Sequence, residues 1–462
     1  MRRAFILLSY ILWLNTSIVW ANDVRDTGLA ILDITTMDGQ EPECEFVFAP
    51  ENAFGIGIRN CTKIKGRIIL TEQGDTLYDS GDYEKDQHGM TIRIRGNTSA
   101  YYSVKKPYKI KLEKKNDLFN RRDSAYYDKN WILIDDGGDM LNTMIGLKVN
   151  ELIGLGGWTP AYKFVNLFMN GDYRGVYMLV ESIKRNADCR LNVDKHTGYI
   201  IERDAYWWNE EVWFSSESGK QFTFKYPDDK DVTSQQTDYI QQTINDVERA
   251  IAQGNYPEYI DVNSFAAWML AHDILGTKDS GGANIYLTKY DDSQDSKVSM
   301  STLWDFGSIM KTPNTWSRIR TDDFFYFKQL FENKNNSFTA TYMNLWERLS
   351  DSLFLSIKEF LTYFASSPTA SAIDMSRHYD GQRWNYEPSS VNDNVEEALS
   401  WFSQRQKWIS QQLATDHISH TENAKHPVHE KTYNIGGHPT KTEKTGIYIS
   451  NGKKYIAGKT IR

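Results

Sequence analysis

Apolar and polar residues alternate along the first part of the chain. From about Leu29 to Leu112 the runs LAILDITT, KGRIILTE, MTIRIRG and PYKIKLEK are separated by turns of Gly, Asp and Asn. A half-buried strand alternates its side chains between core and solvent, so this period of two predicts a mostly β region. The run NWILIDD extends the pattern.

The next segment mixes a helix with further strands. A helical period covers Leu141 to Leu152, and KFVNLFMNGDYRGVYMLVESI predicts a hairpin whose turn is Asn170-Gly171. Asn-Gly is favoured in two-residue hairpin turns because both positions need a positive φ. The run GYIIERD predicts another strand.

Helical periodicity dominates the second half. Helices are predicted over Gln235 to Ile251 and over Ser264 to Leu275, the latter preceded by the capping candidates Asp261 and Asn263. A strand hairpin over residues 284–304 follows, and residues from about 323 to 413 are mostly helical and rich in Phe, Trp and Leu. This order predicts an α+β fold with a β-rich N-terminal lobe and a helical C-terminal lobe.

Composition and charge narrow the class of protein. Hydrophobic residues make up 40% of the chain and aromatic residues 13%, which supports a large core and leaves disorder to the tails. The formal net charge is −8. A nucleic-acid groove needs a concentrated basic face, so we expect no nucleic-acid partner.

The first 21 residues have the order of an export signal. Met1-Arg2-Arg3 precedes an apolar stretch from Ala4 to Leu14, and Val19-Trp20-Ala21 supplies small or apolar residues for cleavage. The apolar stretch is too short to remain as a membrane-spanning helix. We therefore expect an exported chain that begins near Asn22 and has no transmembrane segment.

The three cysteines of such an exported chain leave two interpretations. Cys44 and Cys61 flank a hairpin-sized segment, and a disulfide that closes a loop of this size contributes about 3 kcal/mol. The alternative is three buried thiols, with Cys189 as the third. A zinc site is not expected, because the chain has no C-x-x-C pair and no nearby histidine cluster.

Side chains suited to phosphate and metal chemistry are spaced around the 284–304 hairpin. Asp279 precedes Asn284 in the pattern D-x-x-x-x-N, and Asp305-Phe306-Gly307 follows the apolar run VSMSTLW. Protein kinases place a catalytic Asp, a metal-binding Asn and a DFG aspartate in this order. Each residue is also common in turns, so the combination carries the signal. Thr277-Lys278 replaces the kinase His-Arg, which excludes an ordinary protein kinase.

Several more motifs occur in a fixed order with this hairpin. Arg95-Gly96-Asn97-Thr98-Ser99 is followed by Lys105-Lys106-Pro107-Tyr108, by NGDYRGVYMLVE, by D-x-x-x-x-N and by a W-D strand end. Together they resemble the spore-coat protein H (CotH) kinase family over roughly residues 29–413. The resemblance implies a two-lobed atypical protein-kinase-like fold. It also implies a secreted kinase that uses ATP with Mg²⁺ or Mn²⁺ to phosphorylate Ser or Thr of an extracellular protein.

The resemblance gives the hairpin residues their roles. It places Asp279 at the catalytic-base position and Asn284 and Asp305 at the metal positions. Two departures from the family pattern leave reduced activity or a pseudokinase open: Gly307 stands where a second carboxylate is frequent, and Asn142-Thr143 stands where an Arg-Asn pair is usual.

The upstream motifs supply the nucleotide-binding candidates. Gly96 permits close backbone approach to phosphate oxygens. Lys105 or Lys106 is expected to reach the α and β phosphates, and we favour Lys105 because it holds the family's first-lysine position. Glu181, at the end of GVYMLVE, is a candidate partner for that lysine or an exposed strand charge. The nucleotide-binding candidates are therefore Arg95, Gly96, Asn97, Ser99, Lys105, Lys106 and Glu181.

The C-terminus carries a second resemblance. GIYISNGKK, with its Asn451-Gly452 turn, resembles the end of a type IX secretion sorting domain, and a plain two-stranded tail is the alternative. The resemblance implies contact with secretion machinery and a location outside the cell or on its surface, with the periplasm as the alternative. The expected organisation is a signal peptide (1–21), a β-rich region with the phosphate-loop candidate (22–112), the remainder of the kinase-like domain (113–414), a His-rich linker (415–432) and a sorting segment (433–462).

A second function remains open at this point. Aromatic residues such as Tyr101-Tyr102, Tyr206-Trp207-Trp208 and Trp213 suit stacking on sugars or partner proteins, although core or loop packing is their commoner use. The alternative is therefore a catalytically weak or inactive CotH-like surface binding or adhesion module. A hydrolase is not expected, because the chain has neither a G-x-S-x-G elbow nor an H-E-x-x-H helix.

Overall fold

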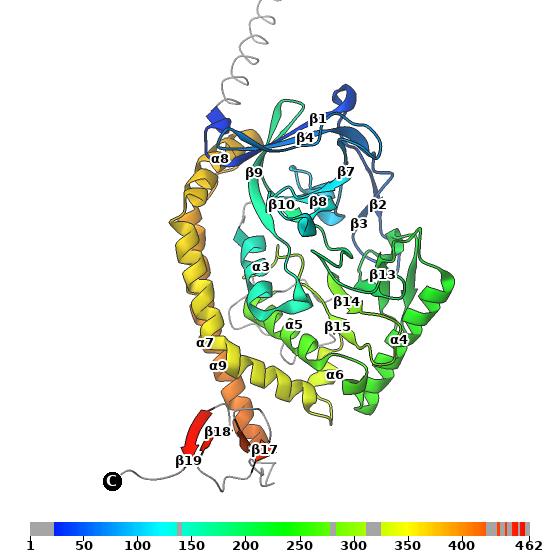
Figure 1. Ribbon diagram of the computed structural model, residues 1–462, viewed down its shortest axis with the longest axis vertical. Coiled ribbons are helices and arrows are strands. Elements are labelled where there is room, and N and C mark those ends of the chain that lie inside the picture. The colour runs from blue at the N-terminus through cyan, green and yellow to red at the C-terminus, as the bar shows by residue number, and fades with distance from the viewer. Residues whose placement is uncertain are drawn as a thin grey trace, which may run out of the picture. The chain divides into compact units, whose positions relative to one another are not determined.

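The computed structural model describes residues 23–135, 141–277, 283–310 and 325–421, together with four short strands between 432 and 457. The chain divides into two compact units, residues 1–408 and 409–462. The first unit has the mixed α+β composition that the sequence predicts, with sheets in its N-terminal part and helices in its C-terminal part (Figure 1). Its description as a two-lobed kinase-like fold stays a prediction, as do the domain boundaries. The expected signal peptide lies outside the described residues.

The first sheet closes into a ring. Its strand order is β1-β9-β10-β8-β7-β6-β4-β5, and β1 also pairs with β4. The sheet is therefore closed: β1, β9, β10, β8, β7, β6 and β4 surround a core, and β5 lies outside the ring beside β4. Among the described strands of this sheet, β1 and β9 form the one parallel pair, and the other pairs are antiparallel. The strands are β1 (Ala30–Thr36), β4 (Ile64–Glu72), β5 (Asp75–Asp79), β6 (Met90–Ile94), β7 (Tyr108–Asn116), β8 (Asp128–Ile134), β9 (Tyr162–Met169) and β10 (Asp172–Glu181).

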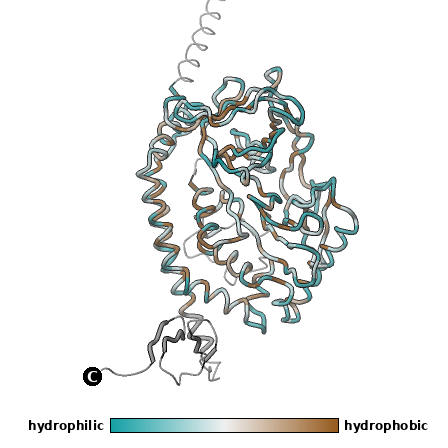
Figure 2. The backbone as a smooth tube through the Cα atoms, in the orientation of Figure 1, coloured by the Kyte–Doolittle hydropathy of each residue, from teal (hydrophilic) through white to brown (hydrophobic). Residues whose placement is uncertain are grey.

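The ring encloses one hydrophobic core. Alternate residues such as Leu32, Ile68 and Ile92 are fully buried in it, which is the two-residue period seen in the sequence. The predicted Asn170-Gly171 turn is confirmed, because Met169 pairs with Asp172 and both turn residues have positive φ. Figure 2 shows hydrophobic segments inside the first unit and hydrophilic loops at its surface.

A second sheet has the order β12-β13-β11-β14-β15. Its strands are β11 (Tyr199–Arg203), β12 (Trp213–Ser215), β13 (Gln221–Tyr226), β14 (Ile285–Lys289) and β15 (Val298–Met300). Strands β14 and β15 are antiparallel neighbours, which confirms the hairpin predicted over residues 284–304. Two further strands, β2 (Glu45–Phe48) and β3 (Ile56–Arg59), form a small sheet of their own, and the short helix α2 (Thr98–Tyr102) contacts β3.

Seven further α-helices lie within the described residues. They are α3 (Leu141–Ile153), α4 (Ser234–Gln253), α5 (Val262–Leu275), α6 (Phe327–Phe331), α7 (Ser337–Ala365), α8 (Pro368–Trp384) and α9 (Val391–Thr421). Asp261 caps α5 as predicted, by accepting bonds from Asn263 N and Ser264 N. Every residue from Phe265 to Leu275 is buried, so α5 is a central helix that contacts α3 and α7. Within the described ranges, no helix is long and apolar enough to cross a membrane.

Single-turn 3₁₀ helices connect several of these elements. They are η1 (Met37–Gly39), η2 (Ser124–Tyr126), η3 (Leu155–Gly157), η4 (Trp207–Asn209) and η5 (Tyr256–Glu258).

The second unit contains a small antiparallel sheet. Its order is β17-β16-β18-β19, formed by β16 (Thr432–Asn434), β17 (Pro439–Thr440), β18 (Gly446–Ser450) and β19 (Lys453–Ala457). Ser450 pairs with Lys453, so β18 and β19 are antiparallel neighbours, and the predicted turn residues 451 and 452 lie outside the described residues. Helix α9 continues to Thr421, past the linker boundary expected at residue 415. Whether the segment is a sorting domain stays a prediction.

Candidate active site

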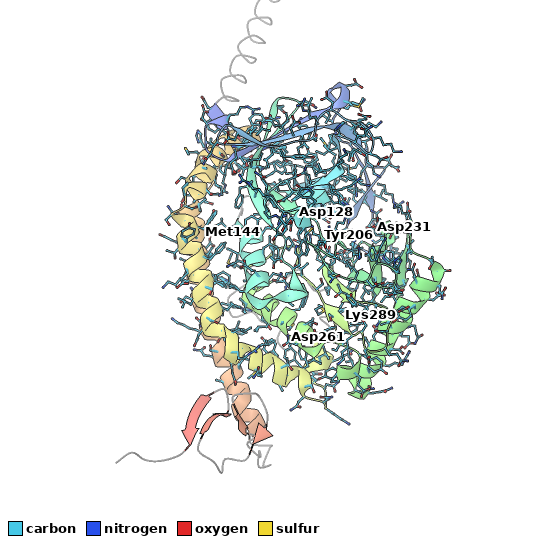
Figure 3. The ribbon with its side chains drawn as sticks, in the orientation of Figure 1. Asp128, Met144, Tyr206, Asp231, Asp261 and Lys289 are labelled. Atoms are coloured by element: carbon cyan, nitrogen blue, oxygen red, sulfur yellow. The ribbon has the colours of Figure 1, made fainter. Side chains whose placement is uncertain are left out.

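A cavity of about 640 Å³ lies between the first and second sheets. Residues of β6, β7 and β8 line one side, and residues of β11, β13 and β14 line the other. The predicted loop residues Arg95, Gly96, Asn97 and Ser99 line it, and so do Asn284 and Asp305. The fold therefore brings together six residues that the sequence had singled out. Tyr206, labelled in Figure 3, also lines the cavity and shares a hydrogen bond with Thr98.

Gly96 is required by the shape of its loop. Its φ is 79°, and a Cβ atom there would lie 2.4 Å from Ser99 Oγ. Both the left-handed backbone and the close contact favour glycine. Because glycine has no side chain, a ligand in the cavity can approach the loop backbone closely at this position.

Asn284 and Asp305 meet across the cavity. Asn284 Nδ2 donates a hydrogen bond of 3.1 Å to Asp305 Oδ2. Their φ values are 59° and 65°, in the left-handed region that Asn and Asp adopt more readily than other non-glycine residues. The two side chains therefore meet without a demanding backbone geometry.

Helix α3 positions the Asp305 segment. The Phe306 ring is buried against Gly146, where a Cβ atom would come within 2.0 Å of Phe306 Cδ1. Asn150 Oδ1 accepts a 2.9 Å bond from Leu303 N. Glycine at 146 therefore makes room for the ring, and Asn150 fixes the segment that leads from β15 to Asp305.

Basic side chains gather on the first-sheet wall. Arg93 on β6 pairs directly with Lys109 on β7, and Arg95 follows at the end of β6 on the same face. Burial, followed by the charges of Arg93, Arg95 and Lys225, lowers the pKa of Lys109 to about 8. In the part of the chain that the structure describes, no hydrogen bond or ion pair reaches these three side chains. The acids Asp305 and Glu202 attract Arg95 without forming an ion pair with it. Clustered cations that no carboxylate contacts directly are available to bind an anion.

The opposite wall carries an ion pair that the sequence analysis missed. Lys225 Nζ lies 2.9 Å from Glu202 Oε2, and Glu202 Oε1 accepts a 3.2 Å bond from Asn284 N. Burial raises the pKa of the Glu202 carboxyl to about 7. Glu202 thus links a cavity cation to the Asn284 backbone. The strand run GYIIERD contained Glu202, but nothing local distinguished it from a surface charge.

A comparison of the sequence with models of protein families identifies the family. The model of the family described as CotH kinase protein matches residues 92–409. This chain belongs to the CotH kinase family. The match includes the cavity residues from Arg93 onward, on both walls. Membership supports a kinase-like phosphotransferase function in general. The comparison with curated proteins gives no match.

Within this CotH kinase chain, the predicted lysines have built-in partners. Lys105 does not line the cavity: its Nζ is buried, 2.8 Å from Asp380 Oδ2 and 3.0 Å from Asp135 Oδ1, and it donates to Val176 O. Lys106 Nζ donates to the carbonyls of Ala100 and Ser103, so it stabilises α2 and the turn after it.

Glu181 is paired with arginines instead of Lys105. It is buried and lies 2.6 Å from both Arg121 Nη2 and Arg190 Nη1. It also accepts bonds from Trp158 Nε1 and Ala161 N. The expected Lys105–Glu181 pair is therefore wrong, and so is the alternative of an exposed strand charge, because β10 ends inside an ionic cluster.

The remaining sequence predictions concern the catalytic base, a metal site and the cysteines. Asp279, the expected catalytic base, lies outside the described residues. Among residues that are described, no group of three or more His, Cys, Asp or Glu side chains forms a metal-binding cluster. The three cysteines are free thiols, and burial together with the neighbouring Cys61 raises the pKa of Cys44 to about 11.

Proposed function

We propose that this protein transfers the γ-phosphate of ATP to Ser or Thr hydroxyls of an extracellular protein. The observation that carries the proposal is the single cavity in which unpaired Arg93, Arg95 and Lys109 face Asn284 and Asp305. Phosphoryl transfer depends mainly on positioning and on neutralising charge, so cations and metal ligands on one cavity suit it.

The cations of the first-sheet wall would bind the ATP phosphates. Arg95 and Gly96 belong to one loop, so guanidinium and backbone groups act on the same phosphate chain. Lys109 replaces Lys105 in this role, because Lys105 is already neutralised by two carboxylates. Lys225, held by Glu202, adds a cation from the second sheet.

Asn284 and Asp305 fit the metal role by their donor atoms. Mg²⁺ and Mn²⁺ prefer oxygen ligands and are commonly held by one or two protein groups together with substrate phosphates. A carboxylate beside an amide, within hydrogen-bond distance of each other, meets that requirement. The metal would supply charge neutralisation on the transferring phosphate. Asp279 would accept the proton of the attacking hydroxyl.

Export and outer-membrane passage belong to the same proposal. They rest on the charged, apolar and small-residue order of residues 1–21 and on GIYISNGKK near the C-terminus. A chain truncated after Ala414 should then accumulate in the periplasm. If it reaches the medium as efficiently as the full chain, the tail is not a sorting signal.

One experiment tests the catalytic proposal. Purified protein is incubated with labelled ATP, with Mg²⁺ or Mn²⁺, and with dephosphorylated casein as acceptor. We expect transfer by the wild type, loss in Asp305→Ala, and a reduction of about 10²- to 10⁴-fold in Asp279→Asn. Asp292→Ala, in the turn between β14 and β15, is the matched control and should keep wild-type activity. Equal activity in all four proteins would refute the assigned roles.

A surface binding module without catalysis is the second candidate. Its support is the group of exposed aromatic side chains near the loop, of which Tyr102 is 70% exposed. Absence of ATP binding in calorimetric titration, with a folded protein, would favour it over the kinase.

A further inference from the structure

Strand β2 is exposed to solvent on both of its faces. Glu45, Phe46 and Phe48 are exposed and Val47 is only partly covered. Within the described residues β2 pairs only with β3, so its other edge is open. An open strand edge offers unpaired N–H and C=O groups to another chain.

The backbone groups on the two edges can be assigned from the hydrogen bonds of β3. Ile58 N donates to Asn97 Oδ1 and Ile58 O accepts from Asn209 Nδ2, so the groups of Ile58 point away from β2. Phe46 is the antiparallel partner of Ile58, so its own groups point away from β3.

The neighbouring pairs agree with this alternation. Ala49 N donates to Gly55 O, which continues the inner ladder, so Phe48 also directs its groups outward. The β3 edge is thus closed by two asparagine side chains. On the β2 edge, the N–H and C=O groups of Phe46 and Phe48 have no partner in the described part of the chain.

Exposed aromatic rings lie beside this open edge. Phe46 and Phe48 pack edge-on against Tyr101, with ring centroids 5.1 and 6.2 Å apart, and Tyr101 packs against Tyr102. Phe48, Tyr102 and the nearby Val104 are each at least 66% exposed. Together these residues, which we term the β2 platform (Phe46, Phe48, Tyr101, Tyr102 and Val104), combine a main-chain template with apolar contact surface.

The β2 platform is continuous with the cavity wall. Ile58, the cross-strand neighbour of Phe46, lines the cavity, and so do Asn97 and Asn209, which close the β3 edge. Helix α2 carries Tyr101 and Tyr102 and also contributes Thr98 and Ser99 to the lining. A chain bound at β2 is therefore held next to the site of phosphoryl transfer.

We propose that the open edge of β2 docks an extended segment of the protein to be phosphorylated, as a third strand whose side chains lie on the β2 platform. The occupant is a polypeptide because alternating donors and acceptors at strand spacing match a main chain. Main-chain pairing would give affinity without a strict sequence, and the aromatic rings would select apolar residues near the acceptor hydroxyl. This inference rests on the proposed kinase function.

The test measures docking and ATP binding separately on the full mature chain. Hydrogen exchange at residue resolution follows the amides of Phe46 and Phe48 with and without excess dephosphorylated casein. Phe48→Pro removes the outward N–H at an edge position where proline is tolerated, and Tyr102→Ala removes an exposed ring. Tyr363→Ala, a 77% exposed residue on α7, is the control. ATP affinity is measured by calorimetry for each protein.

We expect casein to slow exchange at Phe46 and Phe48, and we expect Phe48→Pro to raise the KM for casein about tenfold, since loss of one strand contact costs about 1.4 kcal/mol. ATP affinity should stay at the wild-type value, and the control should match the wild type. Unprotected amides with casein, or an unchanged KM in Phe48→Pro, would overturn the docking site while leaving the kinase proposal intact.

Two other outcomes also decide the question. Concentration-dependent protection of the same amides without casein, with a dimer mass in light scattering, would assign the edge to a second copy of this chain and overturn substrate docking. Protection by casein without any ATP binding would keep the docking site and refute the proposed function.

Discussion

Lys105 and Lys109 are close in sequence, yet the fold gives them opposite surroundings. Lys105 is buried between Asp380 and Asp135, which neutralise it. Lys109 lines the cavity beside Arg93 and Arg95, and in the described ranges no acid forms an ion pair with it, although the charge of Asp228 attracts it. A buried cation with its partner built in holds elements together, whereas a cation without one is available to a ligand. The comparison separates structural from binding basic residues in this chain.

The largest expected effect concerns the paired cluster. Asp380→Ala should lower the free energy of unfolding by about 3–5 kcal/mol, because it removes one partner of a buried ion pair. Burial raises the pKa of Asp380 despite the nearby Lys105, which shows that desolvation opposes the attraction. Urea unfolding followed by circular dichroism measures the change. Glu387→Ala, which changes an exposed acid just beyond α8, is the control. Equal urea midpoints for the two variants would show that the Lys105–Asp380 ion pair does not stabilise the fold.

The second prediction addresses the unpaired cluster. Arg95→Ala should weaken ATP binding by about 10- to 100-fold, because a hydrogen bond to a charged group contributes about 1.5–3 kcal/mol. Stability should stay constant or rise, because burial disfavours the charged Arg95 side chain more than the nearby acids favour it. Calorimetric titration with ATP and Mg²⁺ measures the affinity. The control Arg122→Ala, which changes an exposed arginine, should leave the ATP affinity unchanged. If Arg95→Ala lowers stability without weakening ATP binding, Arg95 has a structural role like that of Lys105.

The third prediction tests how α3 positions the metal candidate. Gly146→Ala places a methyl group against the Phe306 ring and should cost about 1–3 kcal/mol through overpacking. Because Phe306 adjoins Asp305, phosphoryl transfer should fall together with stability. The double variant Gly146→Ala with Phe306→Leu should recover part of both, because it reduces the crowding. If the single variant is fully active, Phe306 packing does not set the position of Asp305.

The smallest effect is a pH dependence of Lys109. Its pKa of about 8 in the folded protein is below the ordinary lysine value. Between these values the unfolded chain binds more protons, so stability should rise as pH increases above about 8. ATP affinity should fall over the same range, because neutral Lys109 no longer attracts phosphate. Lys109→Arg should flatten the affinity profile between pH 7 and 9, and an unchanged slope would exclude Lys109 from phosphate binding.

Local patterns in the sequence were sufficient to predict several structural features. The Asn170-Gly171 turn, the Asp261 cap and the hairpin of β14 and β15 depend on neighbouring residues only, so they could be predicted. The loop around Gly96 and the Asn284–Asp305 pair were found through motif spacing, and both line the cavity. These features share one physical basis, namely backbone preferences and short-range hydrogen bonds.

The tertiary structure alone decided which charges are satisfied. Lys105 was expected at the phosphates, yet its partner Asp380 comes from α8, far along the chain. Glu202 and Lys225 meet only because β11 and β13 are neighbours in the second sheet, and Lys109 faces the cavity only through its register with Arg93. The sequence determines that this chain belongs to the kinase family and where its motif loops are. Electrostatic pairing depends on distances between segments remote in sequence, so only the folded chain determines which cations hold the fold and which remain for a ligand.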